Sequence, residues 1–173
     1  MYGPEGAFNA QQSGVVPRAI SMLFQSLEDN DNIIEFTIKV AFIEIYLEQM
    51  RDLLNIDGSK NSKSTKSKKG KAKKKVHKSA KQKQMEKDAN KLRIRTLPNG
   101  STIIQNLYEE ECDSLMDVLG LIQTASQNRT TSSTLMNHTS SRSHLVMITS
   151  LEQKMQDGST RLSKLNFADL VCA

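Results

Sequence analysis

The chain has 173 residues, which one folded domain accounts for, and 37% of them are hydrophobic, as expected of a globular protein. The sequence predicts no membrane-spanning helix, because no stretch approaches roughly 18 continuous apolar residues. The N-terminus lacks the layout of a signal peptide, so we expect a protein of the cytoplasm or the nucleus. The two cysteines, Cys112 and Cys172, lie far apart and predict free thiols rather than a metal site.

The net charge of +5 conceals two regions of opposite sign. Residues 60–91 contain 14 lysines against Glu86 and Asp88, which is a local charge of +12. Since the total is +5, the rest of the chain carries −7. This pattern predicts an acidic folded body that is interrupted by one basic insert.

The first third of the chain predicts a loop, a helix and a strand. Residues 1–14 are rich in Gly, Ser, Asn and Gln, which is typical of a loop. Pro17 suits the first turn of a helix, and apolar residues follow it at helical spacing. These residues are Ile20, Leu23, Phe24 and Leu27. Residues 34–47 predict a long central strand that is covered on both sides, since both of its faces are largely apolar towards its end.

A low-complexity insert of Lys, Ser, Gly, Ala and Gln occupies residues 57–91. Its apolar surface is too small to offset the entropy cost of folding, so we expect a disordered loop. Three roles are open for it: a solvated loop, an electrostatic tether to an acidic protein surface, or a contact with nucleic acid. The third role is the weakest, because the insert has no aromatic residue that could stack on a base.

After the insert, residues 92–107 predict a β-hairpin that turns at Pro98-Asn99-Gly100. A helix is expected to follow from a cap at Asp113 or Ser114. Its apolar stripe is Leu115, Val118, Leu119 and Ile122.

The last third predicts a loop and two strands. Residues 127–143 are rich in Ser, Thr and Asn, which favours a loop. Strands are expected at residues 144–152 and 161–171, joined by a turn at Asp157-Gly158. Because strands and helices alternate around an internal hairpin, the sequence predicts an α/β fold with a mixed central β-sheet flanked by helices.

The densest group of reactive side chains lies at residues 137–144, Asn-His-Thr-Ser-Ser-Arg-Ser-His. Hydroxyl groups can bind Mg²⁺, and an arginine can pair with phosphate or carboxylate. The alternative interpretation is an ordinary capping loop, because such loops are commonly rich in Ser, Thr and Asn.

Asp169 follows the apolar run Leu165-Asn166-Phe167-Ala168. An acidic residue at the carboxyl end of a strand is well placed for a ligand site, and in phosphate-binding folds such a residue holds Mg²⁺ through water. The alternative is an ordinary turn residue at a strand end. The sequence contains no HExxH, paired CxxC, GxSxG or GxxxxGK[ST] signature.

Five segments, in order, resemble motifs of the kinesin motor family. Residues 14–19 (GVVPRA) are similar to the GIIPRA that opens the helix after the phosphate loop, and residues 44–54 (EIYLEQMRDLL) resemble EIYNExxxDLL. Residues 128–137 (NRTTSSTLMN) match the run that leads into switch I, and residues 137–144 (NHTSSRSH) resemble switch I itself, NxxSSRSH. Residues 163–170 (SKLNFADL) resemble SKLNLVDL, the approach to switch II.

This resemblance implies that residues 1–173 form one partial kinesin motor domain with a P-loop-related fold. It implies ATP as substrate, Mg²⁺ as cofactor and the microtubule as partner, at the cytoskeleton. Ser140 and Ser141 would contact the γ-phosphate, and Ser141 would also lie in the Mg²⁺ shell. Asn137 would position the attacking water, Arg142 would form the switch salt bridge, and Asp169 would hold Mg²⁺ through water.

The sequence also departs from the family pattern. The family's GxxxxGKT loop precedes the segment that Met1-Tyr2-Gly3-Pro4 resembles, so we expect the chain to begin after this loop. Switch II continues as DLAGSE in the family, whereas Val171, Cys172 and Ala173 follow Leu170 here. Cys172 thus stands where the family has its phosphate-sensing glycine. The helices that carry most of the family's track contacts would come later still.

Two hypotheses follow. In the first, the chain is a fragment of a motor ATPase and is inactive by itself. In the second, it is a non-catalytic, degenerate motor that binds microtubules or other acidic partners through the Lys-rich insert.

Overall fold

The computed structural model describes residues 14–56, 91–134 and 143–170. The Lys-rich residues 57–90, for which we expect a disordered loop, lie outside the described residues. So do residues 135–142, which hold most of the predicted switch I motif. The described residues form two compact units, in which residues 55–108 are separate from the rest.

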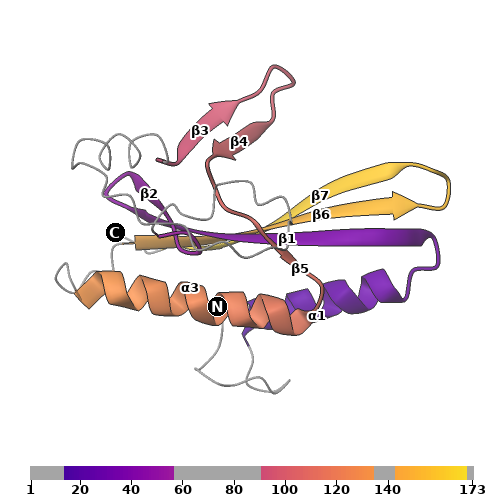
Figure 1. Cartoon of the computed structure of the whole chain (residues 1–173), viewed down its shortest axis with the longest axis horizontal. Helices are drawn as coiled ribbons and strands as arrows, with labels where there is room; N and C mark the ends of the chain where they lie inside the picture. Colours follow the sequence, from indigo (N-terminus) through magenta and orange to yellow (C-terminus); the bar gives the residue numbers. More distant parts are fainter. Residues whose placement is uncertain (1–13, 57–90, 135–142, 171–173) are drawn as a thin grey trace, which may run out of the picture. The chain divides into compact units, whose positions relative to one another are not determined.

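The larger unit is built on a five-stranded sheet (Figure 1). Its strands are β1 (Ile33–Tyr46), β2 (Gln49–Asp52), β5 (Glu110–Cys112), β6 (Ser143–Met155) and β7 (Thr160–Asp169). The order is β2-β1-β6-β7, and β5 pairs with β1 beside β2. The predicted strands at residues 34–47, 144–152 and 161–171 are therefore confirmed to within a few residues, whereas β2 and β5 are too short for the sequence to have indicated them.

Every strand pairing among the described residues is antiparallel, where the sequence led us to expect a mixed sheet. For two of these pairs the reason is connectivity, because β1 turns directly into β2 and β6 turns directly into β7. A parallel pair needs a crossover of a dozen or more residues, which neither of these connections provides. The turn between β6 and β7 uses Gly158 at φ +80°, as Asp157-Gly158 predicted.

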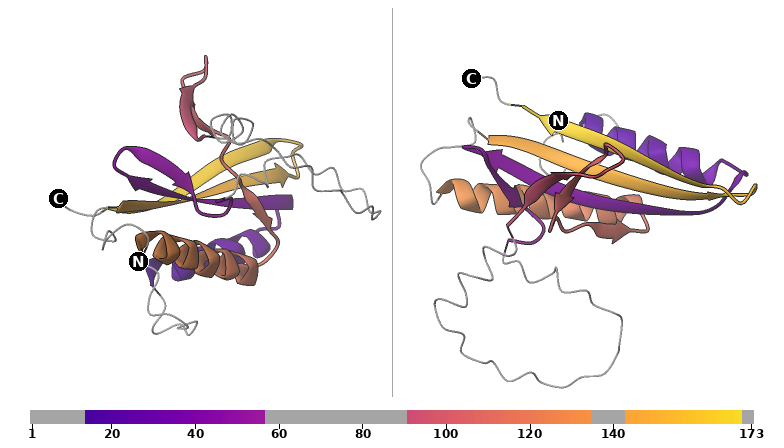
Figure 2. Two further views of the ribbon diagram at one scale, coloured as in Figure 1. Left: turned by 60° about the vertical axis from the view of Figure 1, so that its left-hand side comes forward. Right: turned by 90° about the horizontal axis from the view of Figure 1, so that it is seen from above.

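Helices α1 (Val15–Glu28) and α3 (Leu115–Thr134) lie side by side on the same face of this sheet (Figures 1 and 2). Of the predicted stripe, helix α1 buries Ile20, Phe24 and Leu27, together with Val16, and leaves Leu23 half-buried. The rings of Phe24 and Phe36 of β1 pack edge to face, with their centroids 6.3 Å apart. The helix therefore covers the face of β1 that carries Phe36.

The core lies between these helices and the alternate residues of β1 and β6. In β1, residues 38 and 40–43 are buried, so both faces of its second half are removed from solvent, as predicted for a covered strand. In β6, the side chains opposite Val40 and Phe42 are Thr149 and Met147, and both are buried. Residues directly opposite each other in an antiparallel pair share a face, so Thr149 and Met147 point to the helices.

Helix α3 begins at the predicted cap. The hydroxyl of Ser114 accepts a hydrogen bond from the backbone N–H of Asp117 (3.3 Å), and the Asp117 carboxylate accepts one from the backbone N–H of Ser114 (2.9 Å). This reciprocal pair is a capping box. Of the predicted stripe, Val118, Leu119 and Ile122 are buried, as expected, and Leu115 is half-buried.

Helix α3 ends later than the sequence indicated, because residues 127–134 are helical rather than part of a loop. Ser, Thr and Asn are poor helix formers in isolation. Here, however, Asn128 and Arg129 hydrogen bond to Leu53 and Ser143, which lie on other parts of the unit. These long-range contacts stabilise the last turns in a way that propensity cannot show.

The smaller unit, residues 55–108, contains the predicted hairpin of β3 (Arg93–Thr96) and β4 (Thr102–Gln105). Its turn has Gly100 at φ +80°, and the side chain of Asn99 accepts a hydrogen bond from the backbone N–H of Ser101 at 3.0 Å. Both features are typical of Asn and Gly in turns, and these two residues are the ones from which the turn was predicted. Among the described residues, no helix is long and apolar enough to cross a membrane.

Candidate functional site

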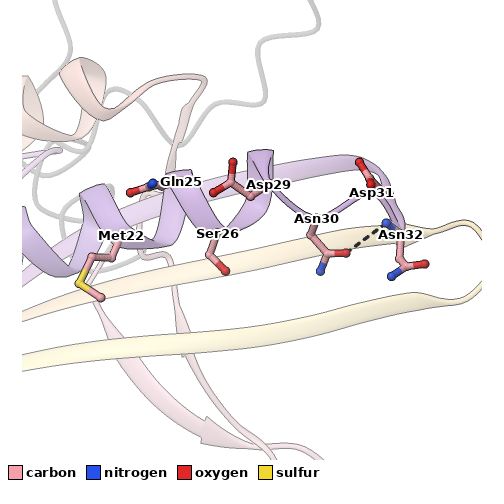
Figure 3. A pocket seen from close by; sticks show the side chains of 7 residues that line it. All are labelled: Met22, Gln25, Ser26, Asp29, Asn30, Asp31 and Asn32. Carbon is pink, nitrogen blue, oxygen red and sulfur yellow. Dashed lines mark hydrogen bonds between the residues drawn. The ribbon is translucent and has the colours of Figure 1, made fainter.

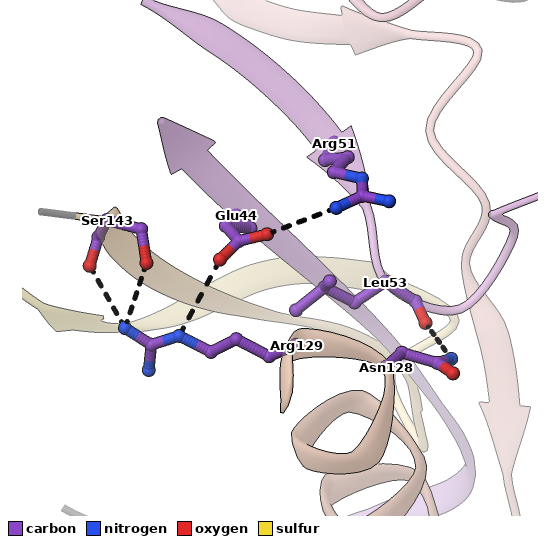
Figure 4. A network of polar contacts seen from close by, with 6 residues as sticks. All are labelled: Glu44, Arg51, Leu53, Asn128, Arg129 and Ser143. Atoms are coloured by element: carbon purple, nitrogen blue, oxygen red, sulfur yellow. Dashed lines mark hydrogen bonds and ion pairs between the residues drawn. The ribbon is translucent and has the colours of Figure 1, made fainter. Parts of the chain in front are cut away.

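Polar and charged residues gather at the end of the sheet where β1 ends and β6 begins. Glu44 of β1 lies opposite Leu145 of β6, and Leu145 lies opposite Asp169 of β7. The three residues therefore form one row across neighbouring strands and share one face of the sheet. The last turns of α3 lie against this row and bring Arg129 to it (Figure 4).

The Arg129 guanidinium is the centre of the cluster. Its Nη2 donates hydrogen bonds to the carbonyl oxygen of Ser143 at 3.0 Å and to the Ser143 hydroxyl at 3.2 Å. Its Nε lies 3.8 Å from Glu44 Oε1, and its Nη1 lies 3.9 Å from Asp169 Oδ2. One side chain thus links α3 to β1, β6 and β7. We call Glu44, Arg51, Arg129, Ser143 and Asp169 the strand-end cluster.

The charges of this cluster are balanced. The Glu44 side chain is only 10% exposed, and it lies 3.8 Å from Arg51 Nη1 on one side and 3.8 Å from Arg129 Nε on the other. A carboxylate this deeply buried would be costly without such partners. Asp169 differs, because its side chain is 46% exposed and water also stabilises its charge. Two cations and two anions leave the cluster formally neutral.

Next to the cluster, α3 is tied to the segment after β2. The side-chain amide of Asn128 donates a hydrogen bond of 2.6 Å to the carbonyl oxygen of Leu53 (Figure 4). Leu53 is fully buried, and its backbone N–H donates to the carbonyl oxygen of Phe42 at 3.0 Å. This chain of contacts fixes the position of α3 relative to β1 and therefore the position of Arg129.

Of the predicted site residues, the structure describes Asp169, which ends β7 and lies in the cluster. Asn137, Ser140, Ser141 and Arg142 lie outside the described residues. The residue that follows them, Ser143, begins β6 and is held by Arg129. His144, the last residue of the predicted motif, lies on the opposite face of the sheet, because neighbouring strand residues alternate.

A Mg²⁺ ion is compatible with the described part of the site, although no group of three or more His, Cys, Asp or Glu residues there could hold a metal ion by itself. Mg²⁺ usually keeps several waters and binds through one or two carboxylates together with substrate phosphates. Asp169 offers one half-exposed carboxylate of this kind. An ion bound only by this chain's described residues would therefore be bound weakly, and phosphate oxygens would complete its coordination shell.

The sequence alone did not single out Glu44, Arg51 or Arg129 as members of a site. One signal was present, since Glu44 is a charged residue within the otherwise apolar run at residues 40–47. A buried charge on a strand requires a partner. Nothing in the sequence indicated that this partner would come from α3, 85 positions later along the chain.

A second feature is a shallow hollow at the far end of β1, where α1 turns into the strand (Figure 3). It is lined by Met22, Gln25, Ser26, Asp29, Asn30, Asp31 and Asn32. The Asn30 side chain accepts a hydrogen bond from the backbone N–H of Asn32 at 3.1 Å, which is an ordinary turn contact. The hollow therefore reflects the turn, and the strand-end cluster is the better candidate site.

Comparison with known proteins agrees with the motifs. The family model of the kinesin motor domain matches residues 1–173. The chain belongs to the kinesin motor domain family. Kinesin-related protein 5 of Dictyostelium discoideum is 34% identical over 163 residues, covering 94% of this chain and 13% of the relative. Kinesin-like protein KIF27 of Rattus norvegicus is 35% identical over 170 residues, covering 92% of this chain and 10% of the relative.

The fold agrees as well. A solved structure described as "Structure of a fast kinesin: Implications for ATPase mechanism and interactions with microtubules" superposes with a TM-score of 0.71 at 24% identity. The match covers 99% of this chain and 40% of that one. The α/β kinesin motor fold expected from the sequence is thus confirmed. This chain spans about a tenth of the length of the curated relatives and under half of the solved kinesin chain.

Proposed function

We propose that this chain is the switch-bearing part of an ATP-driven microtubule motor domain and acts at the cytoskeleton. The proposal rests on one observation: Arg129 contacts both Ser143, the second-last residue of the switch I motif, and Asp169, which begins the switch II motif. A residue that bridges the ends of two such segments is suited to a domain that senses the state of a bound phosphate.

In this proposal, the switch I residues act on the phosphate side of the site. Ser140 and Ser141 contact the γ-phosphate, and the Ser141 hydroxyl also belongs to the Mg²⁺ shell. Asn137 orients the attacking water, and Arg142 forms the switch salt bridge. ATP, when bound, supplies the phosphoryl group that is transferred to water, and positioning and charge stabilisation account for most of catalysis in such reactions.

Asp169 acts on the metal side of the proposed site. Its carboxylate accepts hydrogen bonds from Mg²⁺-bound water, and its position at the end of β7 leaves it half exposed for this role. Arg129 Nη1 lies 3.9 Å from this carboxylate and balances its charge when no Mg²⁺-bound water contacts it. The sheet supplies rigidity, because Asp169 pairs with Leu145, which lies two residues from Ser143 on the neighbouring strand.

A second candidate function is a non-catalytic microtubule-binding protein. Cys172 favours it, since this residue stands where the kinesin pattern has a phosphate-sensing glycine. The 14 lysines of residues 60–91 favour it too, because an acidic microtubule surface would attract them. Both candidates place the protein on microtubules and differ in whether ATP is hydrolysed.

A pair of chimaeras separates the two candidates. In the first, residues 14–170 replace the corresponding part of the motor domain of kinesin-related protein 5, and in the second the replacement extends to residue 173. We expect the first chimaera to show microtubule-stimulated ATPase activity and its Asp169→Asn variant to lose most of it. A folded first chimaera that binds microtubules without hydrolysing ATP would refute the motor proposal. Activity lost only in the second would assign the degenerate state to the segment that contains Cys172.

A further inference from the structure

The contacts of Arg129 differ in length, and a simple ion pair would not explain the difference. Its two hydrogen bonds to Ser143, at 3.0 and 3.2 Å, are of ordinary length. Its distances to Glu44 and Asp169, 3.8 and 3.9 Å, are each about 1 Å longer than a charge-assisted hydrogen bond. The guanidinium is thus anchored on Ser143 and lies between two carboxylates without closing on either.

Sheet geometry keeps the two carboxylates apart. Glu44 and Asp169 lie on either side of Leu145 in one row, so their backbones are two strand spacings, or about 10 Å, apart. A small displacement of the guanidinium towards one carboxylate therefore moves it away from the other. The two ion pairs compete for one cation.

Either carboxylate can tolerate losing Arg129. Glu44 would keep Arg51, whose Nη1 lies 3.8 Å away on its other side. Asp169 would keep contact with water, because about half of its side chain is exposed. Neither arrangement therefore leaves a carboxylate without a partner, and this allows a small change at the site to shift the balance between them.

We propose that Arg129 is a positioning residue shared between Glu44 and Asp169, and that neutralising Asp169 moves the guanidinium to Glu44. Because Nη2 is hydrogen bonded to Ser143, this movement displaces the first residue of β6. A change in the charge of Asp169 is thereby transmitted to the end of the switch I segment. The link to Mg²⁺ rests on the proposed function, whereas the sharing of Arg129 does not.

Double-mutant cycles on the chain test the sharing without any nucleotide. The coupling between Arg129→Gln and Asp169→Asn is measured as the non-additive change in the unfolding equilibrium constant. We expect this coupling to be about twofold in the otherwise unchanged chain. In a Glu44→Gln background, where the competing carboxylate is absent, we expect it to be about fivefold or more. In an Arg51→Gln background, where Glu44 attracts Arg129 more strongly, it should shrink. Equal coupling in all three backgrounds would overturn the proposal.

A second measurement leaves Arg129 in place, in case its variants fail to fold. The NMR signal of the Arg129 Nε–H should move in one direction in Asp169→Asn, as it closes on Glu44, and in the opposite direction in Glu44→Gln. Excess MgCl₂ added to the unchanged chain should move it in the same direction as Asp169→Asn. A signal that is unmoved by either substitution would overturn the sharing, and one unmoved by MgCl₂ alone would overturn the link to the metal. Neither result depends on the ATPase activity of the chimaeras.

Discussion

The side-chain amide of Asn128 donates a 2.6 Å hydrogen bond to the carbonyl oxygen of Leu53, 75 positions earlier in the chain. This bond joins a late turn of α3 to the buried segment that follows β2. It is partly buried, and a buried carbonyl that loses its donor costs about 1–3 kcal/mol. The position of Arg129, the next residue, depends on it.

We therefore expect Asn128→Ala to lower the free energy of unfolding by about 1–3 kcal/mol. Gln123→Ala is the matched control, because Gln123 is exposed on the same helix and should change the stability by less than about 0.5 kcal/mol. Urea unfolding followed by circular dichroism measures both variants. Equal stability of the two variants would mean that the bond contributes nothing.

Cys112 should be chemically inert in the folded chain. Burial, helped by the nearby Asp117 and Glu110 carboxylates, raises the pKa of its thiol from 9.0 to about 12. Only the thiolate reacts with alkylating reagents, and the folded state disfavours it. In a Cys172→Ser variant, which leaves one cysteine, iodoacetamide should react no faster than the chain unfolds. Fast alkylation under native conditions would contradict the burial of Cys112.

The same pKa predicts how stability depends on pH. Below pH 9 the thiol is protonated in both states, so the stabilisation from this group is fully present. Above pH 9 the unfolded chain loses the proton while the folded chain keeps it, and the stabilisation disappears as the pH rises towards 12. Cys112→Ala should therefore flatten the fall in stability over this range, as measured by thermal unfolding at each pH. An unchanged slope would show that other groups cause it.

The Lys-rich insert should bind microtubules by charge alone. Replacing the 14 lysines of residues 60–91 with Ser or Gln should abolish co-sedimentation at low salt, and scrambling the order of these residues should leave it unchanged. Charges on a solvated chain interact over about 8 Å at physiological ionic strength, so binding of the unchanged chain should weaken steeply with added salt. If the Lys-free variant sediments as well as the original, the insert is only a solvated loop.

Strand β7 should promote self-association of the chain. It ends the described strand order, and its Leu162 side chain is 78% exposed. An exposed strand edge with apolar side chains is a template for pairing with another chain, and a lysine on such a strand opposes this. Leu162→Lys should reduce the aggregate seen by light scattering, whereas Gln123→Lys, which adds the same charge on α3, should not. An equal effect of the two would assign the change to net charge.

The sequence by itself determined the family, the main elements and part of the site. Helix α1, strands β1, β6 and β7 and the hairpin of β3 and β4 follow from hydrophobic spacing and turn residues, which are local properties of the chain. Asp169 could be singled out in the same way, because a carboxylate at the end of an apolar strand is visible in the sequence. The order of the motifs indicated the kinesin family.

Only the tertiary structure decided the rest. The antiparallel order of the sheet, the helical state of residues 127–134 and the strand-end cluster all depend on contacts between distant parts of the chain. Arg129 and Glu44 are 85 positions apart, and neither residue type nor spacing shows that they meet. The register of β1, β6 and β7 sets Glu44 and Asp169 in one row, and the packing of α3 brings Arg129 between them, because burying the apolar face of the helix fixes where its polar end lies.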